Sequence, residues 1–169
     1  LVYWLIKIDK KNMSKLLGNV IDPMVLKDAY GAEEVRFYLM RHMSITHDSN
    51  FTIEDLEQTI TSDLANDLGN LLNRMTSLAE KNNAMDLPSP KDLSEVSLKL
   101  VDESFSVIKE FNQLMSENLI HRALACLWKF INQVNAYFHE QEPWKLAKSD
   151  KDAFTQVLWA TCHSLRVIA

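Results

Sequence analysis

The sequence is poor in the two residues that most often interrupt regular structure, with only 3 glycines and 4 prolines in 169 residues. This scarcity argues against long disordered linkers and against all-β folds, which need many tight turns. No apolar run approaches the ~20 residues that span a bilayer. The first residues, LVYWLIKIDKK, lack the basic start and the small-residue cleavage site of a signal peptide. We therefore expect a helical, cytoplasmic protein with no membrane partner.

Cysteine is also scarce, and the 2 cysteines, Cys126 and Cys162, lie far apart with no CxxC pair. We expect two half-buried thiols in a reducing compartment and no metal bound by this chain. The 5 histidines show no metal spacing and form no catalytic triad with Ser and Asp. The formal net charge of −5 argues against non-specific nucleic-acid binding. Any nucleic-acid contact would have to be local and specific.

Apolar residues at helical spacing dominate the chain after residue 52. One stripe steps by three or four over about seven turns; it contains Ile53, Leu56, Ile60, Leu64, Leu68, Leu71, Met75 and Leu78. Further stripes run through Val101, Phe105, Ile108, Phe111 and Met115, through Ile120, Leu124, Leu127, Ile131, Val134 and Phe138, and through Phe154, Val157, Leu158, Leu165 and Ile168. Four or five amphipathic helices joined by short loops predict a helix bundle.

The first fifty residues or so have a different pattern. LVYWLIKI is typical of a strand and is followed by a loop rich in lysine. A short helix is predicted from Pro23, capped by Asp22, to Gly31, and a second one over AEEVRFYLMRHM. SITHDSNFT then breaks the helical period. We predict a mainly α fold in which a small strand-loop-helix region, residues 1–52, precedes the helical bundle, residues 53–169.

The loop KNMSKLLGNVIDP, residues 11–23, is the only segment that suggests chemistry. Lys15 and its neighbours could bring mobile positive charge to phosphate oxygens, and Gly18 permits close approach of the backbone. Stabilising a phosphate-bearing transition state needs little else. The alternative is an ordinary basic surface loop.

Asn70 and Arg74 are neighbours one turn apart on the first long helix, on a flank away from the apolar stripe. Asp63 and Asp67 share that flank. One interpretation is a solvated face on which Arg74 pairs with Asp67 or Asp63. The other is a set of donors and acceptors that read the edge of a base.

Trp144 follows Pro143 at a break between two helices, with charged residues on both sides. A Trp at a helix start beside a rigid Pro is poorly placed for a deep core. An exposed indole could stack on an unpaired base, whereas a half-buried one would pack the helix junction. Trp4, Trp128 and Trp159 lie within apolar runs and are predicted to be structural.

The loop resembles the K-M-S-K-S signature of class I aminoacyl-tRNA synthetases, which continues L-G-N-V-I-D-P. Met13, Ser14, Lys15 and residues 17–23 match it. Asn12 replaces the first signature Lys, although Lys11 stands one residue earlier. Leu16 replaces the final Ser and so removes a hydroxyl from the loop.

Downstream, DLGNLLNR and NAYFHEQEPWKLAK are similar to the anticodon-binding domain of bacterial methionyl-tRNA synthetases. The resemblance implies that Lys15 is catalytic, stabilising the phosphates of ATP as methionine is adenylated, and that Met13, Ser14 and Lys15 form the ATP-binding loop. It also implies that residues 1–52 are a stem-contact region and residues 53–169 an anticodon-binding bundle. In that bundle Trp144 would stack on an anticodon base, and Asn70 and Arg74 would contact the CAU anticodon. Asn135 and Tyr137, from the N-x-Y pattern, would support the shape of that pocket.

The implied partners are methionine tRNA, methionine and ATP with magnesium. Nothing in the chain resembles the H-I-G-H motif or a nucleotide-binding βαβ region, and no initiator Met is present, so we expect part of a longer enzyme that does not charge tRNA by itself. One alternative is a class I synthetase for leucine, isoleucine, valine or cysteine. Another is a non-catalytic helical module that binds protein, favoured by the negative charge and the altered loop.

Overall fold

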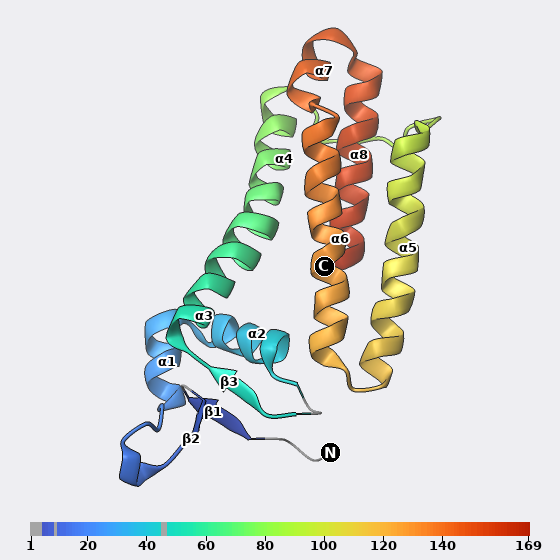
Figure 1. Cartoon of the computed structure of the whole chain (residues 1–169). Coiled ribbons are helices and arrows are strands. Elements are labelled where there is room, and N and C mark those ends of the chain that lie inside the picture. Colours follow the sequence, from blue (N-terminus) through green and yellow to red (C-terminus); the bar gives the residue numbers. More distant parts are fainter. Residues whose placement is uncertain (1–4, 9, 45–46) are drawn as a thin grey trace.

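A computed structural model describes residues 5–8, 10–44 and 47–169 and confirms a mainly α fold with a small sheet (Figure 1). Trp4 lies outside the described residues, so its structural role stays a prediction. A small region built on the sheet lies at one end of the molecule, and a helical bundle forms the rest (Figure 1).

The sheet has the strand order β2-β1-β3. Strand β1, Ile6–Ile8, pairs antiparallel with β2, Lys11–Asn12, and parallel with β3, Ser49–Phe51. The first strand agrees with the sequence pattern. The pattern missed β3, which lies in a segment expected to be irregular and which buries Phe51 in the small core.

Helices α1, Pro23–Tyr30, and α2, Ala32–His42, follow the lysine loop. As predicted, Pro23 opens α1, the Asp22 side chain accepts a hydrogen bond from the Met24 N–H, and Gly31 ends the helix. The small core gathers side chains from both helices, β3 and the next helix. Its buried members are Leu26, Val35, Tyr38, Phe51 and Leu56.

A single helical run follows the sheet, but its middle is not α-helical. Helix α3, Ile53–Thr59, is capped by Thr52 as its TIED sequence predicted. It continues into η2, a π-helical segment over Ile60–Gly69, and then into α4, Asn70–Lys81. Apolar spacing of three or four residues does not distinguish a π-helix from an α-helix, so the stripe predicted the run and not its wide turns.

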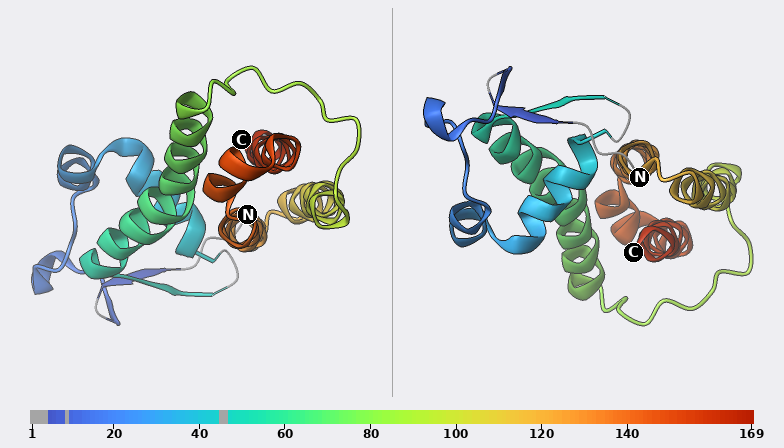
Figure 2. Two further views of the ribbon diagram at one scale, coloured as in Figure 1. Left: turned by 90° about the horizontal axis from the view of Figure 1, so that it is seen from above. Right: turned by 90° about the horizontal axis from the view of Figure 1, so that it is seen from below.

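Four further helices complete the bundle: α5, Glu95–Ser116; α6, Ile120–Glu140; α7, Pro143–Ser149; and α8, Lys151–Ile168. The connection from α4 to α5 passes around the outer side of α8 (Figure 2), where the Ser94 N–H donates to Gln156 Oε1 at 3.0 Å. Helix α6 is the centre of the bundle, since it packs against α2, η2, α5 and α8.

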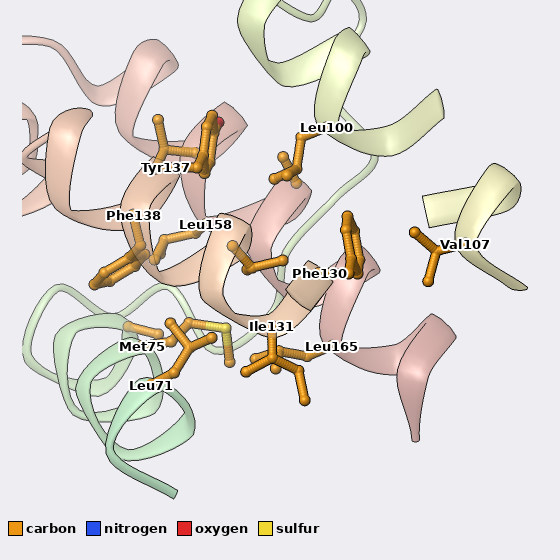
Figure 3. Packing of buried hydrophobic residues seen from close by; sticks show 14 of the residues in the cluster. Leu71, Met75, Leu100, Val107, Phe130, Ile131, Tyr137, Phe138, Leu158 and Leu165 are labelled. Atoms are coloured by element: carbon orange, nitrogen blue, oxygen red, sulfur yellow. The ribbon is translucent and has the colours of Figure 1, made fainter. Parts of the chain in front are cut away.

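The large core lies along α6 (Figure 3). Phe130 and Tyr137 of α6 point toward Val107 and Leu100 of α5, while Phe138 lies beside Leu71 and Met75 of α4. The stripes predicted for α6 and α8 are largely confirmed.

The stripe predicted for α5 is only partly confirmed, because Val101 and Phe111 pack against the large core but the centre of the buried face lies one position earlier, a rotation of about 100°. Phe105 is 58% exposed and Met115 39% exposed, whereas the buried residues are Ser97, Leu100, Ser104, Val107 and Leu114. The buried face thus contains two small serines among its apolar side chains, while Phe105 and Met115 face outward.

Phe37 of α2 packs on Trp128 of α6, with ring centroids 4.6 Å apart, and so joins the small region to the bundle. The division after residue 52 stays a prediction. Cys126 and Cys162 are free and half-buried, as expected. No helix in the described part of the chain is both long enough and apolar enough to cross a membrane.

Candidate functional site

Arg74 of α4 and Trp144 of α7 line one surface hollow of about 270 Å³. The two residues are 70 positions apart in the chain, and the hollow forms because α7 packs beside the C-terminal end of α4 (Figure 1). Its lining residues are Asn73, Arg74, Ser77, Leu78, Lys81, Phe138 and Trp144. The lining carries two cations and no carboxylate, so it is a locally basic site on a chain of net charge −5.

Arg74 is held by an aromatic ring and not by a carboxylate. Its guanidinium carbon lies 5.3 Å from the centroid of the Phe138 ring, within range of a cation–π interaction. Asp63 pairs instead with Arg41, at 3.1 Å. Within residues 5–8, 10–44 and 47–169, no ion pair or hydrogen bond with another side chain occupies the Arg74 N–H groups. The pairing of Arg74 with Asp63 or Asp67 is therefore not found among these residues, and recognition of a base by this flank stays a prediction.

Trp144 is half-buried, and the start of α7 fixes its position. Pro143, the first residue of α7, is fully buried. Glu142 adopts a left-handed conformation (φ 45°), and its carboxylate pairs with Lys145 at 2.7 Å. The His139 ring lies 5.9 Å from the Trp144 ring. The indole thus packs the helix junction with one part and lines the hollow with the other.

Asn70 is exposed and is the first residue of α4, one turn before Arg74, outside the lining of the hollow. Sequence reasoning missed Asn73, Ser77 and Lys81, which line the hollow from the same helix. Ser77 and Lys81 could have been identified, because they follow Arg74 by three and by seven residues and so share its flank. Asn73 directly precedes Arg74, and this spacing does not indicate it.

Asn135 and Tyr137 belong to α6 and do not line the hollow. The Asn135 amide donates to the Asp67 backbone carbonyl in η2 at 2.8 Å. The Tyr137 hydroxyl lies 2.7 Å from Ser97 Oγ on the other side of α6. Asn135 therefore contacts the helical run that carries Asn70 and Arg74, whereas Tyr137 joins α6 to α5.

The lysine loop is held by its own polar side chains. Asn19 Oδ1 accepts from the Ser14 N–H at 2.8 Å, and Asn19 Nδ2 donates to the Asn12 carbonyl at 3.2 Å. Ser14 caps a 3-10 turn, η1, Lys15–Leu17, by accepting from the Leu16 N–H. Gly18 ends that turn with φ 66°, a conformation that glycine adopts without strain.

Lys15 is exposed at the start of this turn. Leu16, which stands where the signature has Ser, is 99% exposed and contributes only its backbone N–H to the loop. The loop keeps its shape without that hydroxyl, because Ser14 and Asn19 supply the hydrogen bonds. The loop lies at the end of the molecule opposite to α7 and the C-terminal end of α4 (Figure 1), which carry most of the residues that line the hollow. In the described part of the chain, no group of three His, Cys, Asp or Glu side chains could hold a metal ion.

Residues 2–76 match the family model described as tRNA synthetases class I (M). A methionine–tRNA ligase of Lactiplantibacillus plantarum is 41% identical over 171 residues, which cover 98% of this chain and 25% of the relative. A methionine–tRNA ligase of Brucella suis is 35% identical over 156 residues, covering 92% of this chain and 30% of the relative. The chain thus spans between a quarter and a third of the length of these two relatives.

The fold is similar to a solved structure of Mycobacterium tuberculosis methionyl-tRNA synthetase in complex with methionyl-adenylate. The TM-score is 0.89 at 30% sequence identity, and the match covers 95% of this chain and 33% of that one. Both parts of the fold, the small region and the bundle, are therefore included in the likeness.

Proposed function

Because this chain is related in sequence and fold to methionine–tRNA ligases over nearly its whole length, we propose that it is part of such an enzyme and binds the CAU anticodon of methionine tRNA. The observation that carries this proposal is the meeting of Arg74 and Trp144 in one hollow. The complete ligase would attach methionine to the tRNA through an ATP-dependent methionyl-adenylate, in the cytoplasm.

The hollow suits an unpaired base. Single-stranded loops are recognised by stacking bases on aromatic rings and by hydrogen bonds to the exposed base edges. Trp144 offers the face of an indole, and Arg74 offers N–H donors in a plane fixed over Phe138. Asn70, one turn earlier, offers both a donor and an acceptor to a neighbouring base. Lys81 adds positive charge at the rim for the phosphate backbone.

The lysine loop would act at the other end of the molecule. We assign Met13, Ser14 and Lys15 to the ATP-binding loop and Lys15 to charge stabilisation of the ATP phosphates during adenylation. Lys15 is exposed, and η1 and Gly18 hold its backbone. ATP would enter with magnesium, and methionine and the nucleotide-binding site would be supplied by the rest of the enzyme.

The proposal is tested by measuring binding of the 169-residue chain to an anticodon stem-loop carrying CAU and to one with a changed first base, at low salt. We expect clear preference for CAU. Equal affinity for both would overturn the proposal. Stem-loops with leucine, isoleucine, valine and cysteine anticodons identify another class I enzyme if one of them binds best. Absence of RNA binding at low salt would instead favour a protein-binding module.

A further inference from the structure

The π-helical segment η2 lies directly before the residues assigned to the anticodon. Its last hydrogen bond runs from the Asn70 N–H to the Ala65 carbonyl, five residues back, so Asn70 itself closes the wide turns. Gly69 fits this geometry, since a Cβ at that position would lie 3.0 Å from the Leu64 carbonyl oxygen. π-Helical turns are rare and are found at functional sites more often than elsewhere.

Two polar contacts from different elements hold η2. Arg41 of α2 donates from Nε to Asp63 Oδ2 at 3.1 Å, with side chains only 22% and 15% exposed. The Arg41 guanidinium also lies 6.0 Å from the Trp128 ring of α6, which limits its freedom. From α6, Asn135 donates to the Asp67 carbonyl at 2.8 Å. The two contacts reach η2 at Asp63 and at Asp67, four residues apart, between the small core and the large one.

The wide turns of η2 affect the direction in which the residues of α4 face. An α-helix advances about 100° per residue, and a π-helix advances less because each turn contains more residues. If part of η2 rewound as α-helix, every residue after it would rotate about the helix axis. Asn70 and Arg74 would leave their present directions, and Arg74 would leave the Phe138 ring.

We propose that Asp63, paired with Arg41, and Asn135 are positioning residues that hold η2 in its wide turns and thereby set the direction in which Asn70 and Arg74 meet the anticodon. The inference rests on the proposed function for its effect on recognition. The anchoring of η2 itself is independent of that function and can be measured without RNA.

The test compares Asp63→Asn and Asn135→Ala with the parent chain in two measurements. The first is amide hydrogen exchange at Asn70, which reports its bond to the Ala65 carbonyl and is expected to become several-fold faster in both variants. The second is the ratio of affinities for the CAU stem-loop and the stem-loop with a changed first base. We expect this ratio to fall by about tenfold. If Asn70 and Arg74 change direction, their hydrogen bonds to base edges are lost, whereas attraction between positive charge and the phosphates is retained.

Two further variants separate positioning from general stability. The double variant Arg41→Asp with Asp63→Arg restores opposite charges at the two positions. It is expected to recover part of the lost preference for the CAU stem-loop. Glu33→Gln breaks an exposed pair with Arg36 on the same helix as Arg41 and serves as the matched control, with both readouts unchanged. If Asp63→Asn fails to fold, Asn135→Ala and the charge swap still test whether these residues position η2.

The outcomes are distinct. Unchanged exchange at Asn70 in folded variants overturns the positioning role. Faster exchange with an unchanged affinity ratio overturns its link to recognition. A parent chain that does not discriminate between the stem-loops, but whose variants show faster exchange, overturns the proposed function while the anchoring of η2 stands.

Discussion

The hydroxyl groups of Ser97 and Tyr137 lie 2.7 Å apart in the buried contact between α5 and α6, and Ser97 Oγ also lies 2.8 Å from Ser94 Oγ. The two partners are therefore not equivalent. Tyr137→Phe leaves Ser97 with Ser94 and is expected to cost about 1 kcal/mol of unfolding free energy. Ser97→Ala strands the buried Tyr137 hydroxyl and is expected to cost more, about 1–3 kcal/mol.

Urea denaturation of both variants measures this difference. Ser94→Gly removes the outer partner but keeps a residue that is tolerated at the N-cap of α5, so this control is expected to cost the least of the three. A larger loss of stability in Tyr137→Phe than in Ser97→Ala would show that packing of the phenol oxygen, and not its hydrogen bond, dominates.

The fold was predictable where large apolar residues mark the buried face. The stripes of α6 and α8 and the caps Asp22 and Thr52 agree with the structure. The face of α5 was not predictable in this way, because its buried residues include Ser97 and Ser104, which are both fully buried. A search for large apolar residues selects Val101 and Phe105, each one position after a buried residue, Leu100 and Ser104.

The site was only partly predictable. Sequence reasoning singled out Arg74 and Trp144, which the fold brings together, but could not show that Phe138 would support the guanidinium. Phe138 was assigned correctly to the core, and its ring also contacts the Arg74 guanidinium. The π-helical turns of η2 depend on contacts from Arg41 and Asn135, which are distant in sequence, so no local pattern indicates them.

Trp144 gives a prediction about stacking. Trp144→Ala is expected to weaken binding of the CAU stem-loop by about 1–3 kcal/mol, the range for one stacked base. Trp144→Phe keeps an aromatic face and is expected to retain most of the affinity. Fluorescence anisotropy with a labelled stem-loop measures both.

The matched control for Trp144 is Phe105→Ala, which removes an aromatic side chain that is 58% exposed on α5, away from the hollow. It is expected to leave affinity unchanged. Equal affinities of Trp144→Ala and the parent chain would remove Trp144 from the interface.

The lysine loop gives a prediction about local order. Ser14→Ala removes the acceptor of the Leu16 N–H and is expected to cost about 1 kcal/mol locally, which speeds exchange of that amide about fivefold. Leu16→Ser changes a fully exposed side chain and is expected to leave the exchange of neighbouring amides unaltered. Hydrogen exchange followed by NMR resolves the individual amides. If both variants loosened the loop equally, the Leu16 side chain would have a structural role that its exposure contradicts.

His42 gives a prediction about pH. Burial lowers the pKa of His42, and the neighbouring Arg41 lowers this pKa further, while Asp63 and Asp55 oppose the shift. Nε2 of His42 lies 2.9 Å from Thr59 Oγ1, whose own proton is donated to the Asp55 carbonyl. The ring nitrogen must therefore be the donor, which the neutral ring satisfies with its proton on Nε2.

Because the folded state holds His42 neutral, the unfolded chain binds the proton first as pH falls through the ordinary histidine pKa of about 6.5. The contribution of this residue to stability is therefore complete above that pH, and it is lost as pH falls toward the lowered folded pKa. His42→Gln is expected to flatten the decline of unfolding free energy between about pH 7.5 and 5.5, measured by urea denaturation. It should remove only part of the slope, because burial also lowers the pKa of His121 and of His163. A slope identical to that of the parent chain would show that His42 takes up its proton as readily in the folded state as in the unfolded one.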